Sequence, residues 1–81
     1  MSDAAVRADA AKRLMEDPLL VELLDGIEEA AVQAWSATGM AQTEDRERAW
    51  HTLKAAQRVR LVLKGVVDNG QIEARRAVAP R

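Results

Sequence analysis

Residues 38–43, Thr-Gly-Met-Ala-Gln-Thr, separate two long segments whose apolar residues recur at helical spacing. Gly39 can take the left-handed conformation that closes the C-terminus of a helix. Thr43 can cap the next helix, and Glu44 and Asp45 place negative charge on its first turn, where the helix dipole favours it. A connection of about five residues is typical of antiparallel helical neighbours. This stretch therefore predicts an antiparallel helical hairpin.

Two further signals set the ends of the helices. Asp17 is a favoured N-cap residue, and Pro18 is tolerated at the first helical position because it lacks an N–H group. The sequence Asp68–Asn69–Gly70 is a typical stop signal. The predicted helices cover about 3–15, about 18–38 and about 44–69. Residues 71–81 are then predicted to be a flexible tail with the basic residues Arg75, Arg76 and Arg81.

The composition indicates an all-α protein. Sixteen of the 81 residues are alanine, Phe and Tyr are absent, and no stretch alternates apolar and polar residues with the period of a strand. The length allows one small domain, residues 1–81.

The apolar stripes predict which side chains form the core of the hairpin. In the second helix these are Leu20, Leu24, Ile27, Ala31 and Ala34, with Leu23 and Ala30 widening the stripe. In the third helix they are Ala49, Leu53, Ala56, Val59 or Arg60, Leu63, and Val66 or Val67. Gly26 lies inside the second helix, where it either permits a close approach of another backbone or is simply tolerated.

Such a core of alanine and valine is small, and the chain has no cysteine to form a disulfide. Other apolar residues lie off the main stripes, namely Leu19, Val32, Leu61 and Val62. We therefore expect a homo-oligomer or a subunit docked on a larger body, the alternative being a marginally stable three-helix monomer.

Trp35 and Trp50 either pack across the hairpin or anchor a partner. The predicted contacts to a partner or second subunit are Trp35, Trp50, Leu61 and Val62.

Charge is segregated along the chain. Residues 1–45 hold three basic and ten acidic residues, and residues 46–81 hold nine basic and three acidic ones, which gives net charges of −7 and +6. One interpretation is attraction between the two long helices, within a hairpin or between subunits. The other is a basic strip that binds nucleic-acid phosphates or an acidic protein, formed by Lys54, Arg58, Arg60 and Lys64.

Several functional classes lack sequence support. His51 is the single histidine, and it follows Arg48 without the Glu-x-x-His spacing of a di-metal bundle site. No nucleophile elbow, phosphate-binding loop or metal-binding motif occurs. We therefore predict no catalytic, cofactor or metal site. No apolar run approaches the length of a membrane span, so the expected location is the cytoplasm of a host cell or a virion.

The middle of the chain resembles a group of short proteins encoded by tailed bacteriophages and prophages. The resemblance covers about residues 12–73 and rests on an ordered set of helical landmarks: Asp17–Pro18–Leu19, Ile27–Glu28, Trp35, Thr38, residues 43–48, Trp50, Leu53, residues 58–60, Gly70 and Ile72. It implies a small helical protein from the head-assembly or DNA-packaging region. The hairpin is also similar to those from which small terminase subunits build rings, although this chain shows no helix-turn-helix module.

Three hypotheses follow for the function. The first is an assembly protein that oligomerises or docks on a phage head, portal or packaging complex. The second is a small inhibitor or adaptor that binds a host protein. The third is an accessory nucleic-acid-binding protein that uses the basic third helix.

Overall fold

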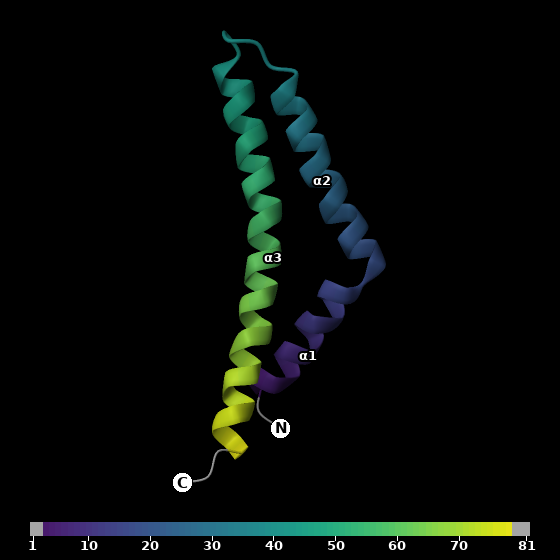
Figure 1. The fold of residues 1–81 in the computed structure, drawn as a ribbon, viewed down its shortest axis with the longest axis vertical. Helices are drawn as coiled ribbons and strands as arrows, with labels where there is room; N and C mark the ends of the chain where they lie inside the picture. The colour runs from purple at the N-terminus through teal and green to yellow at the C-terminus, as the bar shows by residue number, and fades with distance from the viewer. Residues whose placement is uncertain (1–2, 79–81) are drawn as a thin grey trace.

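A computed structural model of the chain describes residues 3–78, which form three α-helices (Figure 1). These are α1 (Asp3–Glu16), α2 (Pro18–Ser36) and α3 (Thr43–Val78). No strand occurs among these residues. The predicted all-α class and the hairpin of α2 and α3 are confirmed.

Helix α3 is the long axis of the molecule, and the other two helices pack along it one after the other. From Thr43, α3 runs antiparallel to α2, while α1 turns back beyond the N-terminal end of α2 to meet the C-terminal part of α3 (Figure 1). Contacts between α1 and α2 are few. The result is a thin, elongated arrangement, 62 × 25 × 15 Å along its principal axes.

The bend between α1 and α2 is built by the predicted cap. Asp17 has an extended backbone, with φ −69° and ψ 118°, and its Oδ1 accepts hydrogen bonds from the backbone N–H groups of Leu19 (2.9 Å) and Leu20 (3.1 Å). Pro18 occupies the first helical position. The cap satisfies N–H groups that have no partner within the helix, so α2 begins at the residue that the sequence indicates.

The connection between α2 and α3 differs from the prediction in two respects. Helix α2 ends at Ser36 rather than at about residue 38, and no glycine in the described chain has a positive φ, so Gly39 does not act as a left-handed cap. The end of α2 is closed instead by Thr38, whose backbone N–H and hydroxyl both donate to the carbonyl oxygen of Trp35.

The start of α3 also differs by one residue from the prediction. Thr43 is the first residue of α3 rather than its cap. The preceding loop is braced by side chains: Gln42 Oε1 accepts from the N–H of Gly39 (2.7 Å), and Arg46 Nη1 donates to the carbonyl oxygen of Gly39 (2.7 Å). The loop is therefore held by hydrogen bonds of the side chains of Gln42 and Arg46, and not by a left-handed glycine.

The predicted end of the third helix at about residue 69 is wrong, because α3 continues through Gly70 to Val78. A flexible tail is therefore not found for residues 71–78, and residues 79–81 lie outside the described residues. Gly70 is buried, and a Cβ atom there would overlap Ala8 Cβ and lie 2.9 Å from the carbonyl oxygen of Ala4. This glycine serves close packing of α1 on α3. Around Gly26, in contrast, nothing lies within 4 Å of the place where a Cβ atom would be, so no backbone approaches it.

The core is small and made mostly of alanine. Its buried apolar residues are Ala8, Ala11, Leu24, Ala31, Ala49 and Ala56. Leu24, 8% exposed, is the only large side chain among them. Of the predicted core of α2, Ile27 and Ala34 are exposed, and at the alternative position in α3 it is Arg60, not Val59, that faces inward.

Candidate protein-binding surface

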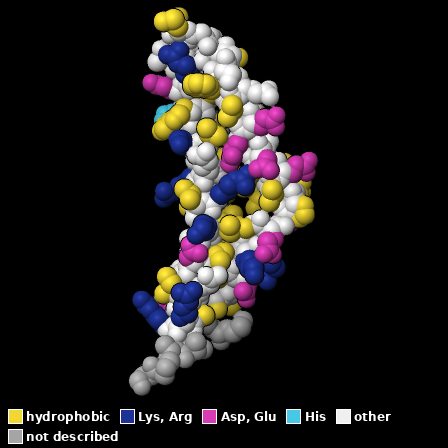
Figure 2. Space-filling model, in the orientation of Figure 1, with side chains coloured by type: hydrophobic (Ala, Val, Ile, Leu, Met, Phe, Trp, Pro, Cys, Tyr) yellow, Lys and Arg dark blue, Asp and Glu magenta, His cyan; other side chains and the backbone are white. Residues whose placement is uncertain are grey.

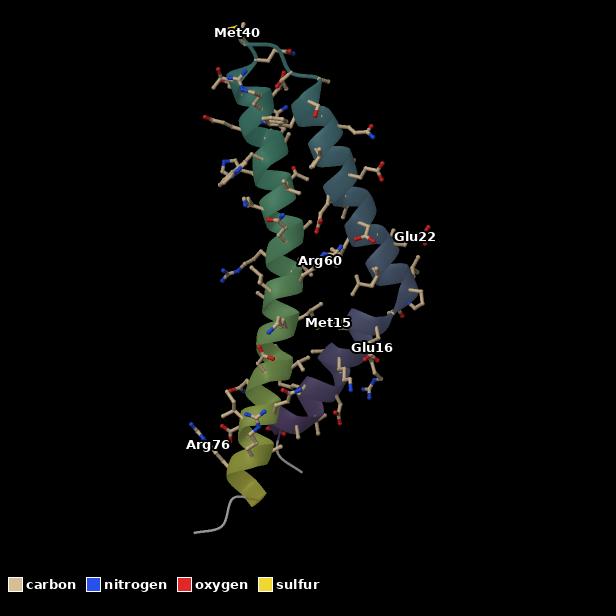
Figure 3. All side chains as sticks on the ribbon, viewed as in Figure 1. Met15, Glu16, Glu22, Met40, Arg60 and Arg76 are labelled. Atoms are coloured by element: carbon tan, nitrogen blue, oxygen red, sulfur yellow. The ribbon has the colours of Figure 1, made fainter. Side chains whose placement is uncertain are left out.

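Arg60 ties the two helices of the hairpin together. It reaches from α3 toward α2 (Figure 3), where its Nε donates to Glu28 Oε1 at 2.9 Å and its Nη2 to Asp25 Oδ1 at 2.6 Å. These are the only ion pairs between different helices among the described residues. The attraction between an acidic second helix and a basic third helix is thus present within one chain.

The environment of Arg60 favours its charged form. The hydrogen bond that it donates to Glu28 raises the pKa of the Arg60 guanidinium above its ordinary value. Desolvation lowers this pKa by a smaller amount, and the hydrogen bond to Asp25 raises it further. Arg60 also lines an apolar cavity of about 80 Å³ between the three helices. Its lining comprises Leu14, Met15, Leu20, Val21, Leu24, Leu63 and Arg60 itself. Arg60 therefore both pairs with α2 and lines a small apolar cavity.

The four predicted phosphate-contacting residues do not form one strip. Arg60 faces α2, and Lys64 pairs with Asp68 of its own helix at 2.9 Å. Lys54 Nζ lies 5.6 Å from the centre of the Trp50 ring, a cation–π contact. Arg58 is exposed and makes no ion pair with the described residues. Figure 2 shows acidic side chains gathered over α2 and basic ones spaced along α3.

The predicted partner contacts are all exposed. Trp35 is 53% exposed and Trp50 51%, so neither is a core residue of the hairpin. The Trp50 ring meets the His51 ring edge-on, with 5.1 Å between their centres. Leu61 and Val62 are also exposed, but adjacent residues on a helix point in directions about 100° apart, so these two belong to different faces of α3.

A continuous apolar stripe runs along the exposed side of α2. Its members recur every three or four residues, the spacing of one helical face: Leu19, Leu23, Ile27, Ala30 and Ala34. The C-terminal half of this stripe borders an apolar groove of about 530 Å³ between α2 and α3. On the α3 side the groove is lined by Ala49 and Thr52, with Arg48 and Asp45 beside them.

A second apolar stripe lies on the side of α3 that carries Thr52. Thr52 lines the groove, and residues at helical spacing from it place the apolar side chains of Ala55, Val59, Val62 and Val66 on the same side of α3. We call the two stripes and the groove between them the groove face. It includes Val62 from the predicted contacts, whereas Trp50 and Leu61 lie on another side of α3.

The sequence reasoning missed part of this surface. Leu23 and Val59 lie on the stripes that predict the core, yet both are exposed. Helical spacing shows that an apolar stripe exists. When the stripe is wide, the side chains along either of its two edges can be the ones that pack against the neighbouring helix, while those along the other edge stay exposed. The choice depends on how the helices cross, which is set here by the Arg60 ion pairs and by the contact at Gly70.

Comparisons with known proteins identify no family for the chain. No protein-family model matches it, and neither a curated protein nor a solved structure gave a match. No helix of the described chain has both the length and the apolar character needed to cross a membrane. Residues 3–78 contain no cluster of three or more His, Asp or Glu side chains that is arranged to hold a metal ion.

Proposed function

We propose that this chain is a non-enzymatic assembly protein of a tailed bacteriophage, a helical hairpin that oligomerises or docks on a head, portal or DNA-packaging complex. The observation that carries the proposal is the distribution of apolar side chains. Among the described residues, the core contains one large buried side chain, Leu24, while most of the groove face and both tryptophans are exposed. Extended apolar surfaces of this kind are typical of proteins that bind other proteins.

The resemblance to short phage proteins supports the choice of partner class. The shape fits such a role as well, because a thin hairpin offers much surface for its mass. The core of a free chain buries little apolar area, so binding a partner would add a large share of its stability.

The test combines solution mass with binding. The purified chain is studied by light scattering at micromolar and submicromolar concentrations, and it is mixed with any portal or large terminase protein that is encoded near its gene. Self-association, or a stable complex with one of these proteins, supports the proposal. A chain that stays monomeric and binds none of them contradicts it.

The same material separates the alternatives. A monomer that forms a complex with one host protein, but with no assembly protein, favours an inhibitor or adaptor. Binding to duplex DNA that weakens steeply with added salt favours the nucleic-acid hypothesis. That hypothesis now rests on Lys54 and Arg58, because Arg60 and Lys64 are engaged in ion pairs.

A further inference from the structure

We infer that the apolar cavity at the bend between α1 and α2 binds one small apolar molecule. We call this cavity the bend pocket; it is the cavity of about 80 Å³ that Arg60 lines together with six apolar side chains. Such a ligand site is independent of the proposed function, because its occupant is a small molecule and not an assembly partner. Four features point to it: the position of the pocket, the chemistry of its lining, its size and its entrance.

The pocket lies where the bend stands away from α3. The chain turns at Asp17, and contacts between α1 and α2 are few. Helix α3 is joined to α2 by the ion pairs of Arg60 and to α1 by the close contact at Gly70. Between these two contacts the ribbons of α1 and α2 diverge from α3 (Figure 1), and Figure 2 shows hydrophobic side chains around a hollow at this place. The bend itself therefore creates the pocket.

The lining of the pocket favours an apolar ligand. Arg60 is the only polar residue in the lining, and two of its guanidinium nitrogens already donate to Glu28 and Asp25. A polar ligand would lose hydrogen bonds to water and find few partners in the pocket, which is unfavourable. An apolar ligand has no such hydrogen bonds to lose, and it gains dispersion contacts with the surrounding side chains. These come from all three helices: Leu14 and Met15 of α1, Leu20, Val21 and Leu24 of α2, and Leu63 of α3.

The volume of the pocket limits the size of the ligand. An apolar cavity of about 150 Å³ can hold benzene or xenon, and the bend pocket, at about 80 Å³, has roughly half of that volume. It is also far smaller than the ~300–1,000 Å³ pockets that hold drug-sized molecules. The ligand is therefore a single apolar atom such as xenon, or a hydrocarbon of about three carbon atoms.

The last turn of α1 provides the entrance to the pocket. Leu14 is 48% exposed and Met15 38%, whereas Leu24, which lines the pocket from α2, is only 8% exposed. The pocket thus lies between two side chains that reach solvent and one that is buried. The unbranched side chain of methionine adapts easily to its surroundings, so a small ligand can pass it without separation of the helices.

Xenon is the probe for this site. Carbon-13-labelled methyl groups of the purified chain are observed by NMR at increasing xenon pressure. We expect saturable shifts for methyl groups that line the pocket, such as those of Met15, Val21 and Leu63, and none for Leu61, which lies outside it. Methanol, which is small but polar, should give no saturable shift at the same methyl groups and concentration. Equal linear shifts throughout the chain, or saturation by methanol as well, would overturn the inference.

A matched pair of substitutions on α2 locates the site. Val21 lines the pocket, whereas Val32 does not and is 47% exposed. Val21→Phe puts a larger side chain at the pocket, and we expect it to weaken xenon binding by at least about tenfold, because the space is filled. Val32→Phe, the same change elsewhere on α2, should alter xenon binding by less than about twofold.

Circular dichroism shows whether both variants keep their helices. If Val21→Phe loses them, Val21→Ile decides instead: it adds a single methyl group and should weaken xenon binding by about threefold. Unchanged xenon binding in the deciding variant would mean that xenon binds elsewhere, which contradicts the inference. The light-scattering and complex-formation tests of the assembly role are made without xenon, so either conclusion can fail while the other stands.

Discussion

Gly70 of α3 packs directly against Ala8 of α1, and its missing side chain allows the contact. Neither Gly26 nor Gly65, the other two helical glycines, has a neighbour within 4 Å of the position that a Cβ atom would take. One glycine out of these three therefore determines how closely two helices approach.

Gly70→Ala should lower the free energy of unfolding by about 0–2 kcal/mol. Overpacking against Ala8 and the Ala4 carbonyl costs about 1–3 kcal/mol, and the better helix propensity of alanine offsets about 1 kcal/mol of it. The control is Gly65→Ala in the same helix, which should raise stability by about 0.5–1 kcal/mol because its surroundings are open. Urea unfolding of both variants gives the comparison. Equal stabilisation by the two would show that α1 does not pack on Gly70.

Asp17→Ala should destabilise the protein by about 1 kcal/mol, because two N–H groups at the start of α2 lose their acceptor. Asp17→Asn keeps a side-chain oxygen at this position and should retain most of the stability. Thermal unfolding followed by circular dichroism measures both. A loss of the same size in the asparagine variant would mean that the charge, and not the cap, matters.

The ion pair between Arg60 and Glu28 should show energetic coupling. In a double-mutant cycle of Arg60→Gln and Glu28→Gln, the double variant should lose less stability than the sum of the two single variants. Arg58→Gln is the control, and it should show no coupling to Glu28 because Arg58 forms no ion pair with the described residues. Because the pKa of Arg60 is raised, its contribution persists through neutral pH and is lost only as pH rises through that raised value. Additive losses in the Arg60 cycle would contradict the pairing.

Leu24→Ala should cost about 2–5 kcal/mol, because it removes the only large side chain that is buried among the described residues. Leu61→Ala should change the stability by less than about 0.5 kcal/mol, since that side chain is largely exposed. Both are measured by urea unfolding at the same protein concentration. Similar losses for the two would place Leu61 in a buried contact.

The fold was predictable where a local signal agreed with the packing. Asp17–Pro18 marks the start of α2 because the cap is made within three residues of sequence. The sequence Asp68–Asn69–Gly70 was misleading because the same residue types serve turns in one context and close helix packing in another. Gly70 packs against Ala4 and Ala8 of α1, more than sixty residues earlier, and a contact so distant in the sequence is not visible in the local pattern.

The candidate surface was predictable only in part, for a similar reason. The excess of apolar residues over what a small core can bury indicated a binding face, and the segregation of charge indicated that α2 and α3 attract each other. Which bases remain free was not visible in the sequence. Arg60 and Arg58 are only two positions apart, so they point to nearly opposite sides of α3. The orientation of α3 about its own axis places Arg60 against α2, where it forms ion pairs, and leaves Arg58 exposed to solvent.

The spacing between Arg60 and Gly70 fixes the distance along α3 between its ion pairs with α2 and its close contact with α1. Arg60 of α3 forms an ion pair with α2, and Gly70, ten residues further along α3, packs against α1. The bend at Asp17 determines the direction in which α2 leaves α1. Inserting or deleting a helical turn in this interval would break one attachment whenever the other was kept. The length of this interval is therefore constrained even where its individual side chains are free to vary.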